Sequence, residues 1–460
     1  MKTLTTDLAR RLQGSPYQGY AYAYPHKSAY RALEGRPLEE VWAAEARDAL
    51  FLYIHVPFCE FRCGFCNLFT QHNPHGSLIE AYLETLTRET AQVQAALRAG
   101  GEPRFARFAI GGGTPTQLDL AGLTRLFDLA EQLGASPLEV PVSIEMSPDT
   151  IDPEKLALLR ERGVDRASMG VQSFLEDESR AAGRPQKTAQ VEQAIEWIQA
   201  AGFPIMNLDL IYGLPSQTSE TWETSLARLI DYAPAEVFLY PLYVRPLTGL
   251  GRRDGCDEAP DDPRLNLYRQ GRDRLLGAGY EQISMRLFRR PEAGLAEAPA
   301  YRCQEDGMVG LGCGARSYTK SLHYSGEYAV GARGVREILS RWVSQTDEEL
   351  SRVAFGFELD AVEQRRRYAI QSLLHSDGLS YSGYRDRFGS DVLSDLPALS
   401  ELGPRGLAVE QEAGLHLTPE GIERSDVLGP WLFSTQVLEL MEAGVGIFPQ
   451  VPDAQCRRGW

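Results

Sequence analysis

The run Phe51-Leu-Tyr-Ile-His-Val56 leads directly into Pro57-Phe-Cys-Glu-Phe-Arg-Cys-Gly-Phe-Cys66, which carries three cysteines, Cys59, Cys63 and Cys66, within eight residues. The aromatic and β-branched residues of the first run predict a strand. Cysteine thiolates hold iron–sulfur clusters, and three of them leave one iron of a four-iron cluster without a protein ligand. The spacing therefore predicts a [4Fe-4S] cluster whose open iron binds an outside ligand or substrate.

Zinc, a disulfide and chance clustering are the alternatives for these three cysteines. Structural zinc prefers four ligands, usually in two separated pairs. A disulfide framework is not expected in a long chain without a secretory signal. Buried cysteines also occur as small apolar core residues. The remaining cysteines are isolated from one another: Cys256, Cys303, Cys313 and Cys456.

Strand-like and helix-like stretches alternate from about residue 50. This alternation predicts parallel strands joined by crossover helices. Six such units predict an α/β fold with a partial (β/α)6 TIM-like barrel, since eight units close the usual barrel. The strand candidates are residues 51–56, 105–110, 140–146, 166–171, 206–211 and 237–243, and the helix candidates are residues 77–97, 120–133, 153–162, 188–201 and 219–232.

Further motifs fall at the ends of these strands. Gly111-Gly-Gly-Thr-Pro-Thr116 follows the second strand, Glu145 ends the third, Gln172 follows the fourth and Asp209 lies late in the fifth. In parallel barrels the loops after the strands converge on one face, where the chemistry takes place. We therefore expect these residues to form one site with the three cysteines.

Composition changes divide the chain into four predicted segments. Residues 1–48 form an arm rich in tyrosine, which either packs on the barrel or serves as a substrate lid. Residues 49–256 form the barrel, and a link rich in Pro and Asp at 257–263 opens an extension on the substrate side over 257–345. Residues 346–460 predict helices with a small hairpin, a winged-helix-like α+β domain. Such a wing does not by itself imply DNA binding.

Charge and hydropathy restrict the classes of partner. The 460 residues contain 47 Lys and Arg against 63 Asp and Glu, a net charge of −16. This balance does not favour nonspecific binding to nucleic acid or to anionic membranes. No apolar run reaches the length of a membrane span, and the first residues lack the apolar segment of a signal peptide. The sequence predicts a cytoplasmic protein.

Taken as a set, these motifs resemble the radical SAM superfamily, in the branch of the oxygen-independent coproporphyrinogen III oxidases and the related haem chaperones. The resemblance extends over nearly the whole chain. It rests on Tyr53-x-His55-x-Pro57-Phe58-Cys59-x3-Cys63-x2-Cys66, Gly111–Thr116, Ser143-Ile-Glu145, Gly170-Val-Gln-Ser173, Asp209-Leu-Ile-Tyr-Gly-Leu-Pro215 and Gly310-Leu-Gly312.

The resemblance implies that S-adenosylmethionine (SAM) chelates the open iron. An electron from the cluster then cleaves its sulfonium to a 5′-deoxyadenosyl radical, and a low-potential donor such as flavodoxin or ferredoxin supplies that electron. Phe65 would pack near the adenine or shield the cluster, Glu145 would accept hydrogen bonds from the ribose or the ammonium group, and Arg184 would pair with the carboxylate. The positions implied for a first SAM also include Tyr53, Gly112, Gly113 and Thr114.

A second SAM lies beside the first in the oxidase branch, and the matching positions here are Gln172, Arg184, Asp209, Tyr243 and Arg316. The sequence departs from the branch at two places. Tyr243 and Arg316 stand where the family has apolar or small residues. The oxidases usually carry a fourth cysteine two residues after the third, whereas this chain has Leu68. This second departure is more typical of the chaperone-like and methyltransferase-like relatives.

Three functions follow as hypotheses from the resemblance. The leading one is a radical SAM enzyme, coproporphyrinogen III oxidase-like, that acts on a small molecule. The second is a tetrapyrrole protein, either a decarboxylase or a haem carrier, and the third is a radical methyltransferase that uses two SAM molecules. For the second, propionates would face basic residues, and haem iron would meet His26, His55 or a free cysteine. The basic candidates are Lys27, Arg31, Arg245, Arg286, Arg289 and Arg316.

Overall fold

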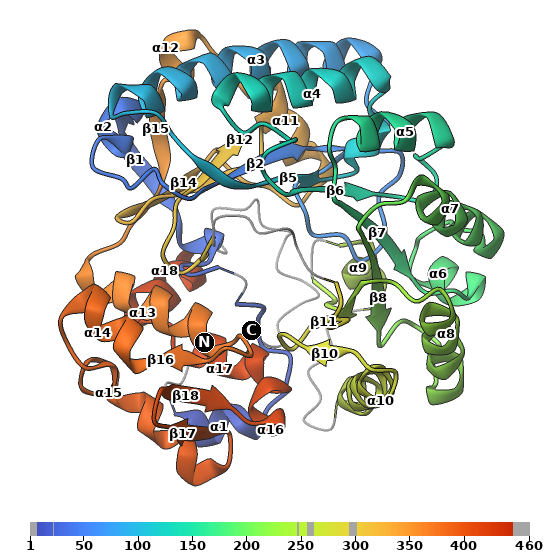
Figure 1. Cartoon of the computed structure of the whole chain (residues 1–460), viewed down its shortest axis with the longest axis vertical. Helices are drawn as coiled ribbons and strands as arrows, with labels where there is room; N and C mark the ends of the chain where they lie inside the picture. Colours follow the sequence, from blue (N-terminus) through green and yellow to red (C-terminus); the bar gives the residue numbers. More distant parts are fainter. Residues whose placement is uncertain (1–6, 22, 246–247, 255–261, 294–300, 445–460) are drawn as a thin grey trace.

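The computed structural model describes residues 7–21, 23–245, 248–254, 262–293 and 301–444. Tyr22, Cys256, Cys456 and most of the predicted link at 257–263 lie outside these residues. The described residues form an α/β fold around one mixed sheet of thirteen strands (Figure 1). Its order is β1-β15-β14-β13-β12-β2-β5-β6-β7-β8-β9-β11-β10.

The six predicted parallel strands are confirmed, and they lie side by side in chain order. Their ends agree with the sequence-based ranges to within two residues. Strand β6 begins after Pro141, which has no N–H to donate to a ladder. The strands are β2 (Leu50–Val56), β5 (Phe105–Gly112), β6 (Val142–Met146), β7 (Arg166–Gln172), β8 (Ile205–Tyr212) and β9 (Glu236–Pro241).

A seventh parallel strand, β12 (Met308–Leu311), pairs with β2 on the side away from β5. The sequence analysis identified this stretch only through the motif Gly310-Leu-Gly312. Glycine weakens the period-two pattern by which a strand is recognised. The glycine is needed because a Cβ at Gly310 would clash with the backbone of Arg316 in the neighbouring strand.

The predicted crossover helices cover the outer side of the sheet (Figure 1). Asp119, Asp152 and Thr218 cap three of them at the N-terminus, where side-chain oxygens accept from backbone N–H groups. The predicted helices are α3 (Gly76–Ala99), α4 (Leu120–Leu133), α5 (Pro153–Glu161), α7 (Thr188–Ala201) and α8 (Ser219–Asp231), and the structure adds α6 (Glu176–Ala181) and α10 (Arg264–Gly277) to them.

Antiparallel strands extend the sheet at both edges. The edge beyond β12 includes strands from both ends of the chain, because β1 of the predicted arm pairs with β15 of the predicted C-terminal segment. The added strands are β13 (Arg316–Tyr318), β14 (Leu322–Ser325), β15 (Arg352–Glu358) and β1 (Arg31–Pro37) on that edge, and β11 (Leu287–Arg289) and β10 (Glu281–Gln282) on the other.

Short elements connect these layers. They are α1 (Leu8–Leu12), η1 (Lys27–Ala29), α2 (Leu38–Trp42), β3 (Phe58–Cys59), β4 (Gln71–His72), η2 (Pro115–Gln117), α9 (Gly249–Asp254), α11 (Ala332–Val343) and α12 (Asp347–Leu350).

Residues after β15 form helices around a small sheet of order β16-β18-β17, which contains the predicted hairpin. The winged-helix-like character of this part stays a prediction. Its elements are α13 (Ala361–Leu373), β16 (Leu379–Ser380), α14 (Tyr381–Phe388), α15 (Val392–Asp395), η3 (Pro397–Glu401), η4 (Gly403–Arg405), β17 (Ala408–Gln411), β18 (Gly414–Leu417), α16 (Pro419–Ile422), α17 (Ser425–Trp431) and α18 (Thr435–Gly444).

The N-terminal arm packs against this C-terminal part as well as against the barrel. Leu8, Tyr24 and Tyr30 belong to the C-terminal core cluster, and the Tyr24 and Phe433 rings lie 5.1 Å apart. Tyr17 instead packs on the barrel, 5.9 Å from the Tyr212 ring. The arm therefore bridges the two cores.

A carboxyl group at Glu89 lies between α3 and the loop after β12. It accepts a hydrogen bond from the Gly312 N–H at 2.6 Å, while burial raises its pKa to about 7. The unfolded chain has the ordinary, lower pKa, so the buried charge destabilises the folded state increasingly as pH rises from about 4.5 to 7.

Glu89→Gln is expected to remove this destabilisation and keep an oxygen for the Gly312 N–H. The variant should be more stable than the parent by on the order of 1–2 kcal/mol at pH 8 and equal to it near pH 4.5. Urea unfolding at both pH values measures the difference. A variant less stable than the parent at pH 8 would show that the ionised carboxylate stabilises the fold.

Candidate functional site

The three cysteines lie on one excursion of the chain after β2. Strand β3 pairs with β4, so the excursion closes on itself, and the Asn73 N–H donates to the Cys59 carbonyl at 2.9 Å. Within it the Cys66 N–H donates to the Cys63 carbonyl at 3.1 Å. The backbone thereby fixes the loop without using the thiols.

Each thiol meets a polar side chain, which comes from another segment for Cys59 and Cys63 and from the same loop for Cys66. The Thr114 hydroxyl donates to the Cys59 Sγ at 3.6 Å, and the Arg184 guanidinium donates to the Cys63 Sγ at 3.4 Å. Cys66 Sγ lies 4.0 Å from the Thr70 hydroxyl. Such groups are suited to hold thiolates, since charge-assisted bonds to an ionised acceptor are the strong ones.

The donor set fits an iron–sulfur cluster. The pKa of Cys59 is raised to about 12. Burial is the main cause, and the nearby Cys66 and Cys63 contribute to the same increase. Metal binding would therefore release protons from these thiols. The described part of the chain contains no three His, Cys, Asp or Glu side chains that would hold a single metal ion. A four-iron cluster does not need such convergence, because each thiolate binds a different iron.

The glycine loop after β5 lies against the cysteine loop. The Gly113 and Thr114 N–H groups donate to the Val56 and Phe58 carbonyls at 2.8 and 2.7 Å. A Cβ at Gly113 would lie 2.5 Å from the Phe58 carbonyl and 3.0 Å from the Cys59 Sγ. Gly112 has φ +116°, and a Cβ there would reach the His55 ring at 2.7 Å. Side chains at these positions would therefore separate the two loops.

Two carboxyl groups, those of Glu145 and Asp209, lie on β6 and β8, the strands on either side of β7. Glu145 on β6 accepts from the Gly112 N–H at 2.9 Å, and its side chain is solvent-accessible. Burial raises the pKa of Asp209 on β8 to about 7, and the charge of Glu145 acts in the same direction. Asn207 donates to Asp209 at 2.7 Å and thereby orients it. Asp209 is thus poised to exchange a proton near neutral pH.

Arg184 is almost completely buried, with 7% of its surface exposed. Besides Cys63 it binds the Gly170 carbonyl at 3.0 Å, and Gln186 accepts from its Nε at 2.7 Å. Gln172 at the end of β7 has φ +66°, and the register of β7 against β8 shifts there. A non-glycine residue in this region costs about 1–3 kcal/mol and is a common feature of functional sites.

The other sequence-predicted residues occupy different surroundings. The Tyr53 hydroxyl on β2 lies 3.2 Å from the His55 Nδ1. Phe65 packs on the apolar cluster that contains Leu214 and Leu250. Arg316 is near His55, whose pKa it lowers together with Lys27, although burial is the larger cause. The structure therefore places most of the predicted residues around the cysteine and glycine loops.

Tyr243 is held by the C-terminal part of the chain. Its hydroxyl donates to Asp426 and accepts from Arg286 at 2.7 Å. The Arg286 guanidinium also binds both oxygens of Asp426, at 2.9 and 2.7 Å, in a pair that is 3% and 1% exposed. The sequence analysis missed Asp426, which lies 183 residues from Tyr243.

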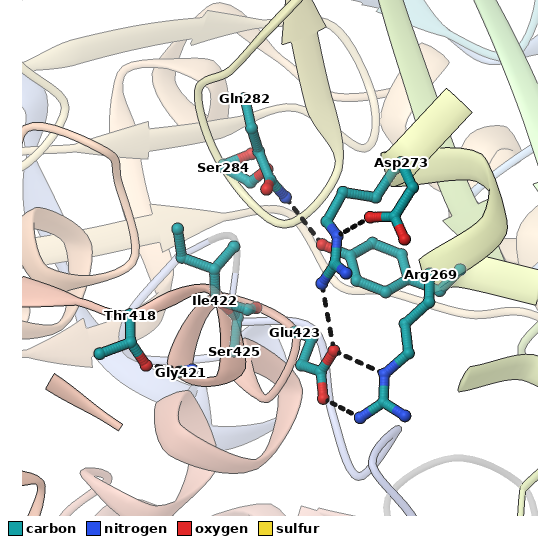
Figure 2. Close-up of polar contacts among 11 residues, drawn as sticks. Arg269, Asp273, Gln282, Ser284, Thr418, Gly421, Ile422, Glu423 and Ser425 are labelled. Atoms are coloured by element: carbon teal, nitrogen blue, oxygen red, sulfur yellow. Dashed lines mark hydrogen bonds and ion pairs between the residues drawn. The ribbon is translucent and has the colours of Figure 1, made fainter. Parts of the chain in front are cut away.

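A second carboxylate, that of Glu423, also joins the C-terminal part of the chain to the barrel. Glu423, on the turn before α17, accepts from Arg269 of α10 at 2.9 and 2.6 Å (Figure 2), and Arg272 binds the same carboxylate at 3.3 Å. Glu423 and Asp426 therefore fasten one turn of the C-terminal part to the barrel.

Among the described helices, none is both long and apolar enough to cross a bilayer.

Comparisons with known proteins identify relatives of this arrangement. The radical SAM superfamily model matches residues 53–229. An oxygen-independent coproporphyrinogen III oxidase of Escherichia coli (strain K12) is 29% identical over 430 residues, 88% of this chain and 91% of that protein. A protein named heme chaperone HemW from the same organism is 30% identical over 279 residues, 58% of this chain and 69% of that protein. The oxidase of Paracoccus denitrificans (strain Pd 1222) is 34% identical over 60% of this chain and 62% of its own length.

A solved structure shares the fold. It is that of the coproporphyrinogen III oxidase HemN from Escherichia coli, a radical SAM enzyme, and it superposes with a TM-score of 0.73 at 24% identity. The superposition covers 89% of this chain and 96% of that one. The likeness confirms the α/β fold predicted from the sequence.

Proposed function

The chain belongs to the radical SAM superfamily, and on that premise we propose that it holds a [4Fe-4S] cluster through Cys59, Cys63 and Cys66 and acts on a small-molecule substrate. The family chemistry that the cluster supplies is one-electron cleavage of SAM into methionine and a 5′-deoxyadenosyl radical. The observation that carries the proposal is the cysteine loop, whose three thiols each face a polar side chain, two of them from other segments and one from the loop itself.

The chain's own residues prepare a place for SAM beside that loop. Gly112 and Gly113 leave the backbone bare, so that the methionine part can approach closely. Glu145 offers an accessible carboxylate for ribose hydroxyls or for the ammonium group, and Arg184 offers a guanidinium for the carboxylate. Asp209 and Gln172 would contact a second SAM or the substrate, and Asp209 can take up or release a proton there.

A tetrapyrrole is the substrate class that the relatives support. An oxidase and a protein named heme chaperone HemW are similar to this chain over 88% and 83% of its length. Leu68, which stands where the oxidases usually have a fourth cysteine, favours a role other than that of the oxidases. We therefore keep two alternatives, a haem carrier and a two-SAM methyltransferase, and a low-potential flavodoxin or ferredoxin as the proposed electron donor.

Anaerobic reconstitution with iron and sulfide tests the proposal. The loaded protein should contain about four irons per chain, and reduction with dithionite in the presence of SAM should release 5′-deoxyadenosine. A well-loaded protein that does not cleave SAM would contradict the enzyme assignment. Release of S-adenosylhomocysteine alongside 5′-deoxyadenosine would favour methyl transfer, and a stoichiometric Soret change on haem titration without SAM cleavage would favour the carrier.

A further inference from the structure

Three basic side chains from distant parts of the sequence lie near one another. Lys27 belongs to η1, Arg245 follows β9 and Arg316 begins β13. Burial lowers the pKa of His26 to about 3, and the charges of Lys27, Arg316 and Arg245 act in the same direction. All three cations are therefore within Coulombic reach of one imidazole.

Packing holds Lys27 next to the cysteine loop. Its ammonium nitrogen lies 3.2 Å from the centroid of the Tyr328 ring, a cation–π contact. The Tyr328 hydroxyl donates to the Asn67 carbonyl at 2.6 Å, and Asn67 directly follows Cys66. Lys27 is therefore tied to the loop through a single ring.

Packing also brings Arg316 to the same place. Ala23 of the arm belongs to a small buried cluster with Met308 and Tyr318. Tyr318 lies two residues after Arg316, so the two side chains share a face of β13. At Ala23 the arm therefore contacts the face of β13 that carries Arg316. Lys27 follows four residues later in the chain.

The structure separates Lys27 and Arg245 from three of the other basic candidates. Arg31 binds backbone carbonyls of Ser28, Tyr30 and Leu440, Arg286 pairs with Asp426, and Arg289 pairs with Glu236. Those three side chains are engaged by the fold itself.

Lys27 and Arg245 differ, because neither forms an ion pair with a carboxylate in the part of the chain that the structure describes. Burial and the charge of Arg316 lower the pKa of Lys27 well below its usual value, although the charge of Cys66 acts in the opposite direction. Both side chains, and that of Arg316, nevertheless retain partial exposure. Lys27 and Arg245, which solvent can still reach, are therefore suited to bind an anion from outside the protein.

We propose that Lys27, Arg245 and Arg316 form a carboxylate-binding site beside the cysteine loop. The site takes a carboxylate of the small-molecule substrate or the methionine carboxylate of a SAM molecule. This inference rests on the proposed function, and it adds that the ligand is recognised by its acid groups. Two guanidinium forks can bind carboxylate oxygens in pairs, and the ammonium adds a compact charge.

Titration of the reconstituted protein with coproporphyrin III and with its tetramethyl ester tests the site. The ester has the same macrocycle and no carboxylates, so it serves as the matched probe. Porphyrin absorbance and fluorescence report binding, and equilibrium dialysis reports SAM binding in parallel. The parent protein should bind the acid more tightly than the ester.

Lys27→Met keeps the length of the side chain and removes its charge. It should weaken binding of the acid by about tenfold or more, because a hydrogen bond to a charged group is lost, and leave the ester unaffected. Arg316→Gln should act in the same way, and Lys27→Arg should restore much of the affinity. Arg36→Gln, at an exposed ion pair with Glu358, is the control that should change nothing.

The outcomes distinguish the two sources of the carboxylate. Loss of coproporphyrin binding with unchanged SAM binding assigns the site to the substrate, and the reverse assigns it to SAM. Equal binding of acid and ester by the parent protein, together with unchanged SAM binding by Lys27→Met, overturns the site even if SAM is cleaved. A protein that prefers the acid yet does not cleave SAM retains the site and loses the enzyme assignment.

Discussion

Cys63→Ala is expected to abolish SAM cleavage and to reduce the iron content of the reconstituted protein to near zero. The loop supplies three thiols and no fourth, so the loss of one leaves two irons of a four-iron cluster without a protein ligand. The effect should exceed the 10–100-fold losses typical of residues that support metal ligands. Cys59→Ala and Cys66→Ala should behave alike. Iron and sulfide analysis, electron paramagnetic resonance and 5′-deoxyadenosine release measure the result.

Two further variants make this result specific. Cys303→Ala removes an exposed thiol outside the loop and should keep full iron content. Thr114→Val removes the hydroxyl that faces Cys59 and should lower activity by roughly 10–100-fold while the cluster still forms. The backbone bonds of the cysteine loop do not use the thiols, so the ligand variants should remain folded by circular dichroism. Full cluster loading of Cys63→Ala would contradict the assignment of this residue.

Asp426→Ala is expected to destabilise the fold by about 3–5 kcal/mol, because it leaves the buried Arg286 guanidinium without its counter-charge. The junction between the barrel and the C-terminal part should loosen, and Tyr243 should lose one of its two partners. Urea unfolding followed by two probes measures the stability, since a chain of this size need not unfold in one step. Limited proteolysis measures the release of the C-terminal part.

The matched comparison is an ion pair on the protein surface, whose side chains are 89% and 53% exposed. Glu337→Ala breaks the pair with Arg333 on α11 and should leave the midpoint of urea unfolding almost unchanged, because solvent screens an exposed pair. The double variant Arg286→Met with Asp426→Leu should recover most of the loss, because it removes both charges together. If Asp426→Ala were as mild as Glu337→Ala, the buried pair would not fasten the C-terminal part.

Local patterns predicted the sheet and the two loops at its centre. Each parallel strand has its own apolar run, and Cys59–Cys66 and Gly111–Thr116 follow their strands directly in the sequence, so their convergence follows from the parallel arrangement alone. The same reasoning placed Glu145 and Asp209 on the third and fifth parallel strands, which the structure shows on either side of β7. The short strand β12 was missed because its glycine weakens the pattern.

Contacts between remote segments could not be predicted in this way. The partner of Tyr243 is Asp426, and nothing near either residue in the sequence points to the other. Lys27 was one of six basic candidates, and only the packing of Tyr328 and of the arm distinguishes it from Arg31. Side chains that meet through tertiary packing leave no periodic signal along the chain.

The pairing of β12 with β2 has a consequence for biosynthesis. Strand β2, which leads into the cysteine loop, ends at Val56, and its second neighbour begins at Met308, about 250 residues later. Translation at about 5–20 residues per second takes roughly 10–50 s to make this stretch. During that time the nascent chain presents an unpaired strand edge next to three thiols. Strand β2 can therefore complete its pairing only after β12 has been synthesised, and until then this edge is open to pairing with another chain.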